Sequence, residues 1–372
     1  MHTCPLSNST GWQHERPGDI TSYTVARKWI GVLSEPMPRE LQNEDALLRK
    51  IADSSRSSRS KTPWRSVSLG IGDDAALFQP KPGHQTILTC DWFLEGTHFL
   101  PDKHPPDSVG WKCLARAVSD VAAMGGTPRC FLLSLALPEA NTGRWLGAFL
   151  AGLRRASRKF QCPLAGGDTT RRDEILINVT VVGEVLAGSA VLRSGARPGD
   201  ILYVTGRLGE AELGLQIVRR GKGAVEKNNP FTRKHLYPEP RLALGQWLVK
   251  KGLATAMMDL SDGLSSDLSR LCAASVVGAL LEKTKIPQVQ IPDAALKQGH
   301  DPLQIALHGG DDYELLFTVP PRNAKLLPKT FRGVGLTAMG RITRNRKLLV
   351  LDERGRAMQL HPRGWDPFRK KL

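Results

Sequence analysis

The chain has 372 residues, 41% of them hydrophobic and 24% charged, which suits a globular protein of about two domains rather than a disordered or fibrous one. Its longest strongly apolar run, 130–137, is far shorter than the roughly 20 residues that cross a bilayer, and residues 1–19 lack a secretory-signal layout. The excess of 52 Lys and Arg over 36 Asp and Glu gives a net charge of +16, compatible with nucleic-acid binding or with steering of anionic substrates. The basic residues lie in short, scattered groups without interleaved aromatic residues, which favours the second interpretation.

The six cysteines are widely separated, and none forms a Cys-x-x-Cys pair or has a histidine nearby to complete a zinc site. We therefore expect free thiols and a cytoplasmic protein. The sequence also lacks the His-Glu-x-x-His pattern, the Gly-x-x-x-x-Gly-Lys-Ser/Thr loop and the Gly-x-Ser-x-Gly motif. The chain therefore lacks the sequence motifs that mark three common classes of enzyme.

The N-terminal part of the chain carries no recognisable chemistry. Residues 1–36 are polar and without clear periodicity, which indicates a disordered extension or a start codon placed too early. A helical pattern follows at 40–51. The Ser- and Arg-rich segment 54–61 is expected to be a solvated loop, although closure over a phosphate is an alternative.

Two adjacent aspartates, Asp73 and Asp74, interrupt the otherwise apolar segment Gly70–Leu77. Adjacent carboxylates repel each other and favour turns over strands, so folding alone gives little reason for them. The pair predicts a cation-binding site.

From residue 67 onward, strand and helix patterns alternate, and we predict a mixed α/β or α+β fold. The predicted strands are 67–71, 85–90, 130–137, 175–185, 201–205, 254–259, 303–308, 314–319 and 348–351. The predicted helices are 108–124, 144–160, 209–220, 240–250 and 263–274. A turn-rich stretch, 193–200, follows a glycine- and serine-bearing link, which places a boundary near residue 190 between domains at 37–188 and 189–372.

Further aspartates lie where a structural role explains them poorly. Asp91 and Asp259 end strand patterns, and Asp168 follows two glycines. Asp120 lies in the last turns of a predicted helix, where the helix dipole disfavours an anion, although a carboxylate paired with a neighbour is an alternative. For Asp262 the alternative is a capping role at the start of the following helix.

Convergence of these carboxylates would require a cation. Two carboxylates about 4 Å apart repel each other by roughly 4 kcal/mol at an effective dielectric constant near 20. Oxygen ligands without a His or thiolate cluster indicate Mg²⁺, the cation that accompanies phosphates.

Seven motifs together are specific enough to indicate a family. They are Gly70–Leu77 (GIGDDAAL), Cys90–Phe99 (CDWFLEGTHF), Ser119–Gly125 (SDVAAMG), Gly166–Thr170 (GGDTT), Arg193–Asp200 (RSGARPGD), Asp259–Asp267 (DLSDGLSSD) and Gly309–Leu315 (GGDDYEL). In order and spacing the chain resembles the thiamine-monophosphate kinases, members of the aminoimidazole ribonucleotide synthetase superfamily, over about residues 40–368.

The resemblance implies two α/β domains, with the first sheet forming a barrel across a homodimer. It implies transfer of the γ-phosphoryl group of ATP to thiamine monophosphate, the last step in making thiamine diphosphate, with several Mg²⁺ ions. The acceptor phosphate has a second pKa near 6, so it is mostly ionised at pH 7 and needs no general base. Metal ions and positioning address the remaining barrier, which is charge repulsion.

The site residues that the resemblance implies fall into three groups. The metal ligands are Asp74, Thr89, Cys90, Asp91, Asp120, Asp168, Asp259 and Asp262. The ATP-binding residues are Gly167, Asp168, Arg193 and Ser261. The residues on the thiamine-phosphate side are His98, Asp311 and Trp365, for which a surface loop histidine and a tail tryptophan docked on the core are the structural alternatives.

Three features depart from the family pattern. Cys90 stands where Thr is common, and because a neutral thiol is a poor Mg²⁺ ligand, its backbone carbonyl is the alternative ligand. Asp311 replaces a more usual Glu and is one methylene shorter, and residues 1–36 have no counterpart.

Other members of the superfamily and a non-catalytic basic binding protein are the rival interpretations. Aminoimidazole ribonucleotide synthetase shares the ATP-binding plan. Selenophosphate synthetase and the hydrogenase-maturation dehydratase share it too, but their reactive N-terminal or C-terminal cysteines are absent here. A binding protein built on a decayed enzyme predicts lost carboxylates, whereas the aspartates above are all present.

Overall fold

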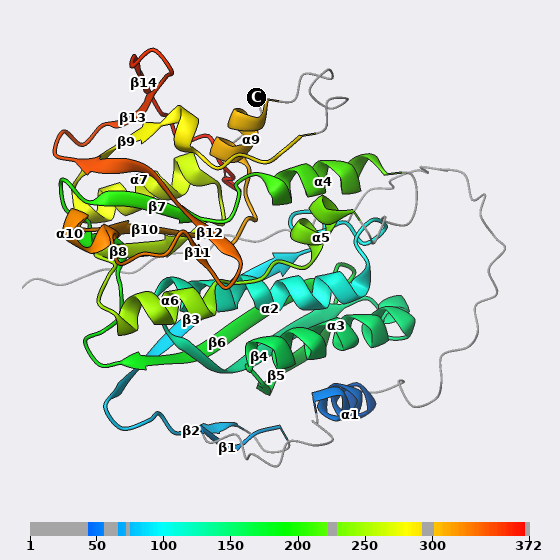
Figure 1. Cartoon of the computed structure of the whole chain (residues 1–372). Helices are drawn as coiled ribbons and strands as arrows, with labels where there is room; N and C mark the ends of the chain where they lie inside the picture. The colour runs from blue at the N-terminus through cyan, green and yellow to red at the C-terminus, as the bar shows by residue number, and fades with distance from the viewer. Residues whose placement is uncertain (1–43, 56–65, 72–74, 222–228, 292–300, 369–372) are drawn as a thin grey trace, which may run out of the picture.

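The computed structural model describes residues 44–55, 66–71, 75–221, 229–291 and 301–368, which form two α/β domains with mixed sheets (Figure 1). In these residues no helix combines the length and the apolar character needed to cross a membrane. The interpretations of residues 1–36 and of Asp73 and Asp74 lie outside the described residues.

The N-terminal domain is built on a four-stranded sheet in the order β3-β6-β4-β5. Its strands are β3 His84–Leu94, β4 Thr127–Leu137, β5 Leu164–Arg171 and β6 Leu176–Leu186, with only the β4–β5 pair parallel. Helices α2 Pro106–Ala123 and α3 Arg144–Phe160 cover one face of this sheet (Figure 1). The smaller elements are α1 Glu44–Ser55, β1 Val67–Leu69, β2 Leu77–Phe78 and the 3-10 turn η2 Glu139–Asn141.

Helices α2 and α3 pack backbone against backbone through two glycines. A Cβ atom at Gly110 would lie 2.0 Å from the carbonyl oxygen of Phe149, and one at Gly152 would lie 1.8 Å from that of Asp107. Only glycine permits this approach. The contact fixes α2, the helix that supplies several side chains of the site, against the rest of its domain.

The other face of the four-stranded sheet carries exposed apolar side chains. Leu88, Trp92 and Leu132 are 71%, 56% and 37% exposed. Leu88 and Trp92 lie two positions apart on either side of Cys90 and therefore share a face of β3. No described residue buries these three side chains, and we call the surface that they define the uncovered face.

The C-terminal domain contains an eight-stranded sheet in the order β14-β13-β9-β12-β7-β10-β8, with β11 paired to β12. All of its pairs are antiparallel except β13 with β9. The strands are β7 Ile201–Thr205, β8 Ala256–Asp259, β9 Gly278–Glu282, β10 Leu315–Val319, β11 Thr330–Phe331, β12 Val334–Thr343, β13 Leu348–Leu351 and β14 Ala357–Gln359. The helices are α4 Glu210–Arg220, α5 Pro230–Leu236, α6 Leu242–Lys250, α7 Leu264–Ser275, α9 Pro302–His308 and α10 Pro321–Ala324, with 3-10 turns η3 Arg193–Gly195 and η4 Lys283–Lys285.

Two apolar clusters cover the faces of this sheet. Helices α7 and α9 contribute to one, which contains Leu268 and Leu307. Helix α6 contributes Leu248 to the other, which also includes Ala123 at the end of α2. Helix α6 therefore lies between the large sheet and α2, and it joins the two domains (Figure 1).

Most predicted elements are present, but the strand predicted at 303–308 is wrong. This segment is helix α9, because the carboxylate of Asp301 accepts hydrogen bonds from the backbone N–H groups of Leu303 and Gln304, and Pro302 occupies the first turn. A short apolar run alone does not separate the two structures. The elements that were not predicted are strands β2, β5, β9, β11, β12 and β14 and helices α5 and α10. The first helix ends at Ser55, inside the segment expected to be a loop.

Candidate functional site

Three of the singled-out carboxylates lie where the two domains meet. Asp91 is on β3, Asp120 is on the last turns of α2, and Asp259 ends strand β8 of the C-terminal domain. Helix α2 contacts both β3 and β8. Most residues of α2 are buried, among them Val109, Cys113 and Ala117.

These carboxylates are electrostatically coupled. Burial raises the pKa of Asp91 to about 6; Arg116 opposes this rise, and Asp120 adds to it. Burial also raises the pKa of Asp259 to about 8, and the charge of Asp120 adds to the rise. Three carboxylates that resist ionisation together form a site that a cation would stabilise.

Asp120 has three partners that favour its charged form, Thr89, Arg193 and Arg116. Burial raises its pKa, while a hydrogen bond from the Thr89 hydroxyl and the positive charge of Arg193 lower it. Arg193 lies on η3, at the start of the C-terminal domain. The structure thus brings Thr89 and Arg193 to the same junction as Asp120. Asp120 is therefore paired with neighbours and also belongs to the coupled group of carboxylates.

The donor set suits Mg²⁺ held partly by a phosphate substrate. Among the described residues, no three His, Cys, Asp or Glu side chains are spaced to hold a metal ion by themselves. Mg²⁺ commonly binds through one or two carboxylates together with substrate phosphates and water, rather than in a cage made only of protein. The coupled carboxylates of Asp91, Asp120 and Asp259 fit that kind of site.

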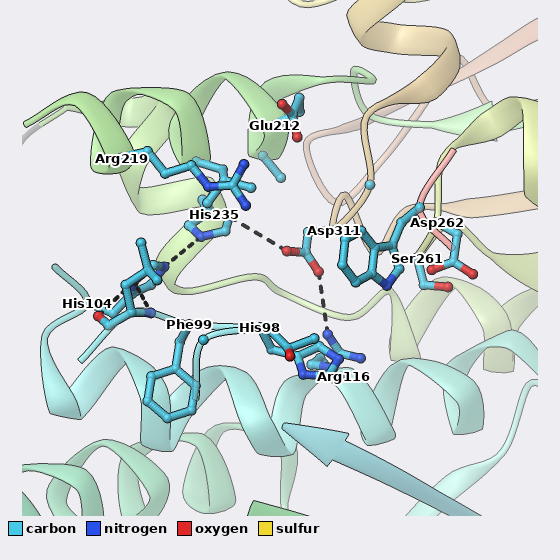
Figure 2. Close-up of a pocket in the computed structure, with 17 residues that line it drawn as sticks. His98, Phe99, His104, Arg116, Glu212, Arg219, His235, Ser261, Asp262 and Asp311 are labelled. Atoms are coloured by element: carbon cyan, nitrogen blue, oxygen red, sulfur yellow. Dashed lines mark hydrogen bonds and ion pairs between the residues drawn. The ribbon is translucent and has the colours of Figure 1, made fainter. Parts of the chain in front are cut away.

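A pocket opens beside these carboxylates, between the two domains (Figure 2). It has about 780 Å³ of space, including volume open to solvent. Its walls come from the loop after β3, from α2, α4 and α5, and from three loops of the C-terminal domain. The predicted site residues that line it are His98, Ser261, Asp262, Asp311 and Trp365.

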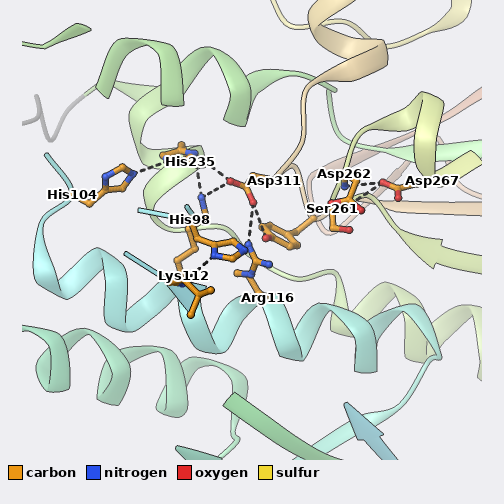
Figure 3. Close-up of polar contacts among 11 residues, drawn as sticks. His98, His104, Lys112, Arg116, His235, Ser261, Asp262, Asp267 and Asp311 are labelled. Carbon is orange, nitrogen blue, oxygen red and sulfur yellow. Dashed lines mark hydrogen bonds and ion pairs between the residues drawn. The ribbon is translucent and has the colours of Figure 1, made fainter. Parts of the chain in front are cut away.

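Asp311 is held by a dense set of donors (Figure 3). The Lys112 ammonium lies 2.8 Å from Oδ2, and the Tyr313 hydroxyl donates to Oδ1 at 2.8 Å. Burial raises the pKa of Asp311, but Lys112, His235 and Arg116 outweigh burial and hold it below its usual range. The carboxylate is therefore ionised and fixed in direction.

The backbone of the Asp311 loop is left-handed at two residues, with φ of +66° at Asp311 and +50° at Tyr313. Non-glycine residues adopt this region rarely. The Asp311 N–H donates to the carbonyl of Ser261 at 2.8 Å, and the Tyr313 N–H donates to that of Leu260 at 2.8 Å. These bonds fix the loop against the segment between β8 and α7.

His98 is a neutral hydrogen-bond donor at the pocket. Burial, then Arg116, lowers its pKa to about 4. Its Nδ1 accepts a hydrogen bond from the Leu94 N–H at 3.0 Å, so the neutral ring carries its proton on Nε2. This places the ring against β3 and the pocket rather than in a free surface loop.

The loop before α7 is organised by Asp267. Its Oδ2 accepts hydrogen bonds from the N–H groups of Ser261 and Asp262, at 3.1 and 3.0 Å. The capping position of α7 is Gly263, with φ of +103°. The alternative that Asp262 caps this helix is therefore wrong; the carboxylate of Asp262 instead pairs with Arg270.

Trp365 lies at the edge of the pocket and is 42% exposed. The backbone N–H of Trp365 donates to the carbonyl of Asp262 at 2.9 Å, and the backbone N–H of Gly364 donates to the Ser266 hydroxyl at 3.0 Å. The tail is thus attached to the start of α7, while much of the indole remains accessible to a ligand.

The remaining predicted residues lie elsewhere. Asp74 is outside the described residues. The Cys90 thiol contacts the Asn178 side chain on the uncovered face, opposite the face of β3 that holds Thr89 and Asp91, so only its backbone carbonyl suits a ligand role. Asp168, next to Gly167, is exposed on β5 in register with Ser134 and shares the uncovered face.

The cations and histidines around Asp311 were not predicted from the sequence. Lys112 and Arg116 precede Asp120 on α2 by two turns and one turn, so all three lie along one side of the helix. The ring nitrogens of His235 and His104 lie 3.0 Å apart, and His235 lies 3.2 Å from Lys112. A lysine and an arginine inside the apolar pattern of α2 were the available signal.

Comparisons with known proteins show the family to which the chain is similar. Residues 72–185 match the family model of the AIR synthase related protein N-terminal domain, and residues 197–351 match that of the C-terminal domain. The chain is 37% identical over 331 residues to thiamine-monophosphate kinase of Escherichia coli (strain K12), covering 87% of this chain and 98% of the relative.

Two solved structures are similar over most of their length. The crystal structure of thiamine-monophosphate kinase from Stenotrophomonas maltophilia K279a has a TM-score of 0.72 and 34% identity, covering 84% of this chain and 96% of that one. A structure described as AaThiL complexed with AMPPCP and TMP has a TM-score of 0.68 and 31% identity, covering 90% of this chain and 100% of that one.

Proposed function

The chain belongs to the thiamine-monophosphate kinase family, within the AIR synthase-related proteins, and we propose that it transfers the γ-phosphoryl group of ATP to thiamine monophosphate, giving thiamine diphosphate and ADP. The observation that carries this proposal is the adjacency of two chemically different regions. One is the carboxylate cluster of Asp91, Asp120 and Asp259, and the other is the pocket around Asp311. Such a site suits a reaction between two anionic phosphates.

The metal ligands are proposed from the carboxylate cluster and its surroundings. Mg²⁺ bound there would neutralise phosphate charge and polarise the transferring group. Several ions are expected. The proposed ligands at the cluster are the side chains of Thr89, Asp91, Asp120 and Asp259. The side chains of Asp74, Asp168 and Asp262 and the backbone carbonyl of Cys90, which the structure does not place at the cluster, are proposed to hold further ions.

ATP is proposed to bind through Gly167, Asp168, Arg193 and Ser261. Arg193 is supported by its charge, which acts on Asp120 and is therefore close to the cluster. Guanidinium groups bind phosphate oxygens by charge-assisted hydrogen bonds. Ser261 lines the pocket beside Asp262, between the cluster and Asp311.

Thiamine monophosphate is proposed to lie against His98, Asp311 and Trp365. His98 offers an Nε2–H donor, and Asp311 offers a fixed carboxylate to the polar ring of the substrate. The accessible indole of Trp365 suits stacking on a cationic heteroaromatic ring.

The reaction needs no general base from the protein. An ionised oxygen of the acceptor phosphate forms the new P–O bond, and the bond between the γ-phosphorus of ATP and its bridging oxygen breaks, leaving ADP. The side chains of this chain bind, orient and neutralise charge. None of the described pocket residues is required to move a proton.

The test is Mg²⁺-dependent release of ADP from ATP with three parallel acceptors: thiamine monophosphate, free thiamine and formylglycinamidine ribonucleotide. Turnover with thiamine monophosphate alone is expected. Turnover with the ribonucleotide alone would assign the chain to the purine branch of the superfamily. No ADP release with any of the three acceptors would overturn the kinase proposal and favour a binding protein.

Three further assignments are proposed with the activity. The domains are divided near residue 189, between the end of β6 and η3, as 37–188 and 189–372.

The uncovered face of Leu88, Trp92 and Leu132 is proposed to pair with a second copy, forming a barrel-like dimer core, because such exposed apolar side chains favour burial. A cytoplasmic location is supported by the free thiols of Cys90, Cys113, Cys130, Cys162 and Cys272, the cysteines of the described residues.

A further inference from the structure

Arg116 is a cation placed between the two regions of the site. It lines the pocket from the middle of α2, one turn after Lys112 and one turn before Asp120. Figure 2 shows its guanidinium beside His98, below Asp311 and facing the cavity. The charge of this one group lowers the pKa of Asp91 on the cluster side and of Asp311 on the pocket side.

The described protein leaves the hydrogen-bonding capacity of Arg116 largely unused. Its Nε is buried without a hydrogen-bond partner among the described residues. Its ion pair with Asp311 is long, at 3.7 Å between Nη1 and Oδ1. A guanidinium has five N–H donors and no acceptor, so donors directed into a pocket await an acceptor from elsewhere.

Asp311 does not need Arg116 as a partner. Lys112 and Tyr313 each contact one of its two oxygens at 2.8 Å. The contact with Lys112 is marked in Figure 3. Arg116 is held from the other side by the Phe93 ring, whose centroid lies 5.5 Å from the guanidinium carbon. This packing restricts the orientation of the planar group, while 17% of the Arg116 side chain remains exposed in the wall of the pocket.

We propose that Arg116 binds the phosphate group of thiamine monophosphate and holds it between Asp311 and the carboxylate cluster. This inference rests on the proposed kinase activity and adds a substrate-binding residue to it. The planar fork of a guanidinium matches two phosphate oxygens, and its charge offsets the repulsion between the acceptor phosphate and the γ-phosphate of ATP.

The test compares two ligands that differ only in the phosphate. Calorimetry measures the Kd of thiamine monophosphate and of free thiamine for the wild-type protein, Arg116→Met and Arg116→Lys. Arg116→Met is expected to weaken binding of thiamine monophosphate by roughly 10- to 100-fold and to leave thiamine binding unchanged. Arg116→Lys is expected to recover part of the loss, because it restores the charge without the fork.

Arg154→Met is the matched control. Arg154 is an exposed residue of α3, outside the pocket, and its substitution changes the net charge by the same amount. It is expected to bind both ligands like the wild type. Thermal unfolding of each variant establishes that the proteins compared are folded.

Two results would overturn the inference. Equal losses of thiamine and thiamine monophosphate binding would show that Arg116 only positions Asp311 or the pocket wall. Unchanged binding of both would show that it contacts neither. In both cases ADP release by the wild-type protein remains an independent measure of the kinase activity, so failure of this inference is distinguishable from failure of the proposed function.

Discussion

Asp120 is the residue whose position most directly links the proposed metal site to the fold. It lies on α2 and interacts with the Thr89 hydroxyl and with Asp259 of the other domain. Asp120→Asn is expected to lower the rate of ADP release by at least roughly 100-fold, because a carboxylate that stabilises transition-state charge through a metal ion is removed.

The fold of Asp120→Asn is expected to survive, because the substitution removes charge repulsion within a partly buried cluster. Thermal unfolding without metal should therefore give a melting temperature equal to or above that of the wild type. Wild-type activity in this variant would remove Asp120 from the metal site.

The raised pKa of Asp259 makes the stability of the folded protein depend on pH, and the direction of this dependence follows from the structure. Its pKa is raised from 3.8 to about 8 by burial first and by Asp120 next, so between these values the folded state retains a proton that the unfolded state has lost. Stability from this group is present at low pH and is lost as the pH rises toward 8.

The measurement is urea unfolding of metal-free protein at pH 5 to 8, comparing the wild type with Asp259→Asn. The wild-type unfolding free energy is expected to fall relative to the variant by up to roughly 1 kcal/mol per pH unit. A difference that stays constant over this range would mean that Asp259 does not titrate there.

At this scale the aspartates could be predicted and their partners could not. An aspartate at the end of an apolar strand, such as Asp259, departs from what folding alone would choose, and the sequence displays that departure. The contacts of Lys112 with His235 and Asp311 exist only because α2, α5 and the Asp311 loop meet in space, and the sequence does not show that meeting. No local pattern records which buried carboxylate a lysine will pair with.

The contact between α2 and α3 is the element-scale feature most open to test. Gly152→Ala is expected to destabilise the protein by roughly 2 kcal/mol or more, because its Cβ would lie 1.8 Å from the carbonyl oxygen of Asp107. Urea unfolding measures this change.

Gly147→Ala, on the same helix, is the control. Gly147 is exposed, and a Cβ atom added there would meet nothing within 4 Å. It is expected to stabilise the protein by roughly 0.5 to 1 kcal/mol. Similar effects at both positions would contradict the close packing of the two helices.

Elements with strong periodicity were predictable, and those defined by their neighbours were not. Helix α3 has a clear apolar face, with Leu146, Leu150 and Leu153 buried. Strand β12 contains Gly335 and Gly340, and β5 contains two adjacent glycines, so neither has the apolar alternation of a typical strand. Their strand conformation comes from pairing with β7 and β4, which a local pattern does not contain.

For the whole molecule, the uncovered face of Leu88, Trp92 and Leu132 bears on the state of assembly. Trp92→Glu is expected to shift a dimer toward monomers at micromolar concentration, because a charge would be buried in an apolar interface. Sedimentation velocity measures the change.

Leu326→Glu is the corresponding control, since Leu326 is 57% exposed in the C-terminal domain, away from this face. It should leave the sedimentation coefficient unchanged. A wild-type protein that sediments as a monomer would contradict the proposed dimer directly.

The two-domain α/β class was predictable from the alternation of elements, whereas the contact of α6 with both domains was not, because it depends on tertiary packing.

The wall of the pocket runs from Gly96 to Trp365, nearly the last residue that the structure describes. A ribosome makes the chain from its N-terminus, so Asp91 and Asp120 emerge long before Trp365. A fragment that stops just before Trp365 would keep Asp91, Asp120 and Asp259, the proposed metal ligands, but would lack the indole proposed to contact the acceptor. Under the proposed function, such a fragment would bind ATP without a complete site for thiamine monophosphate.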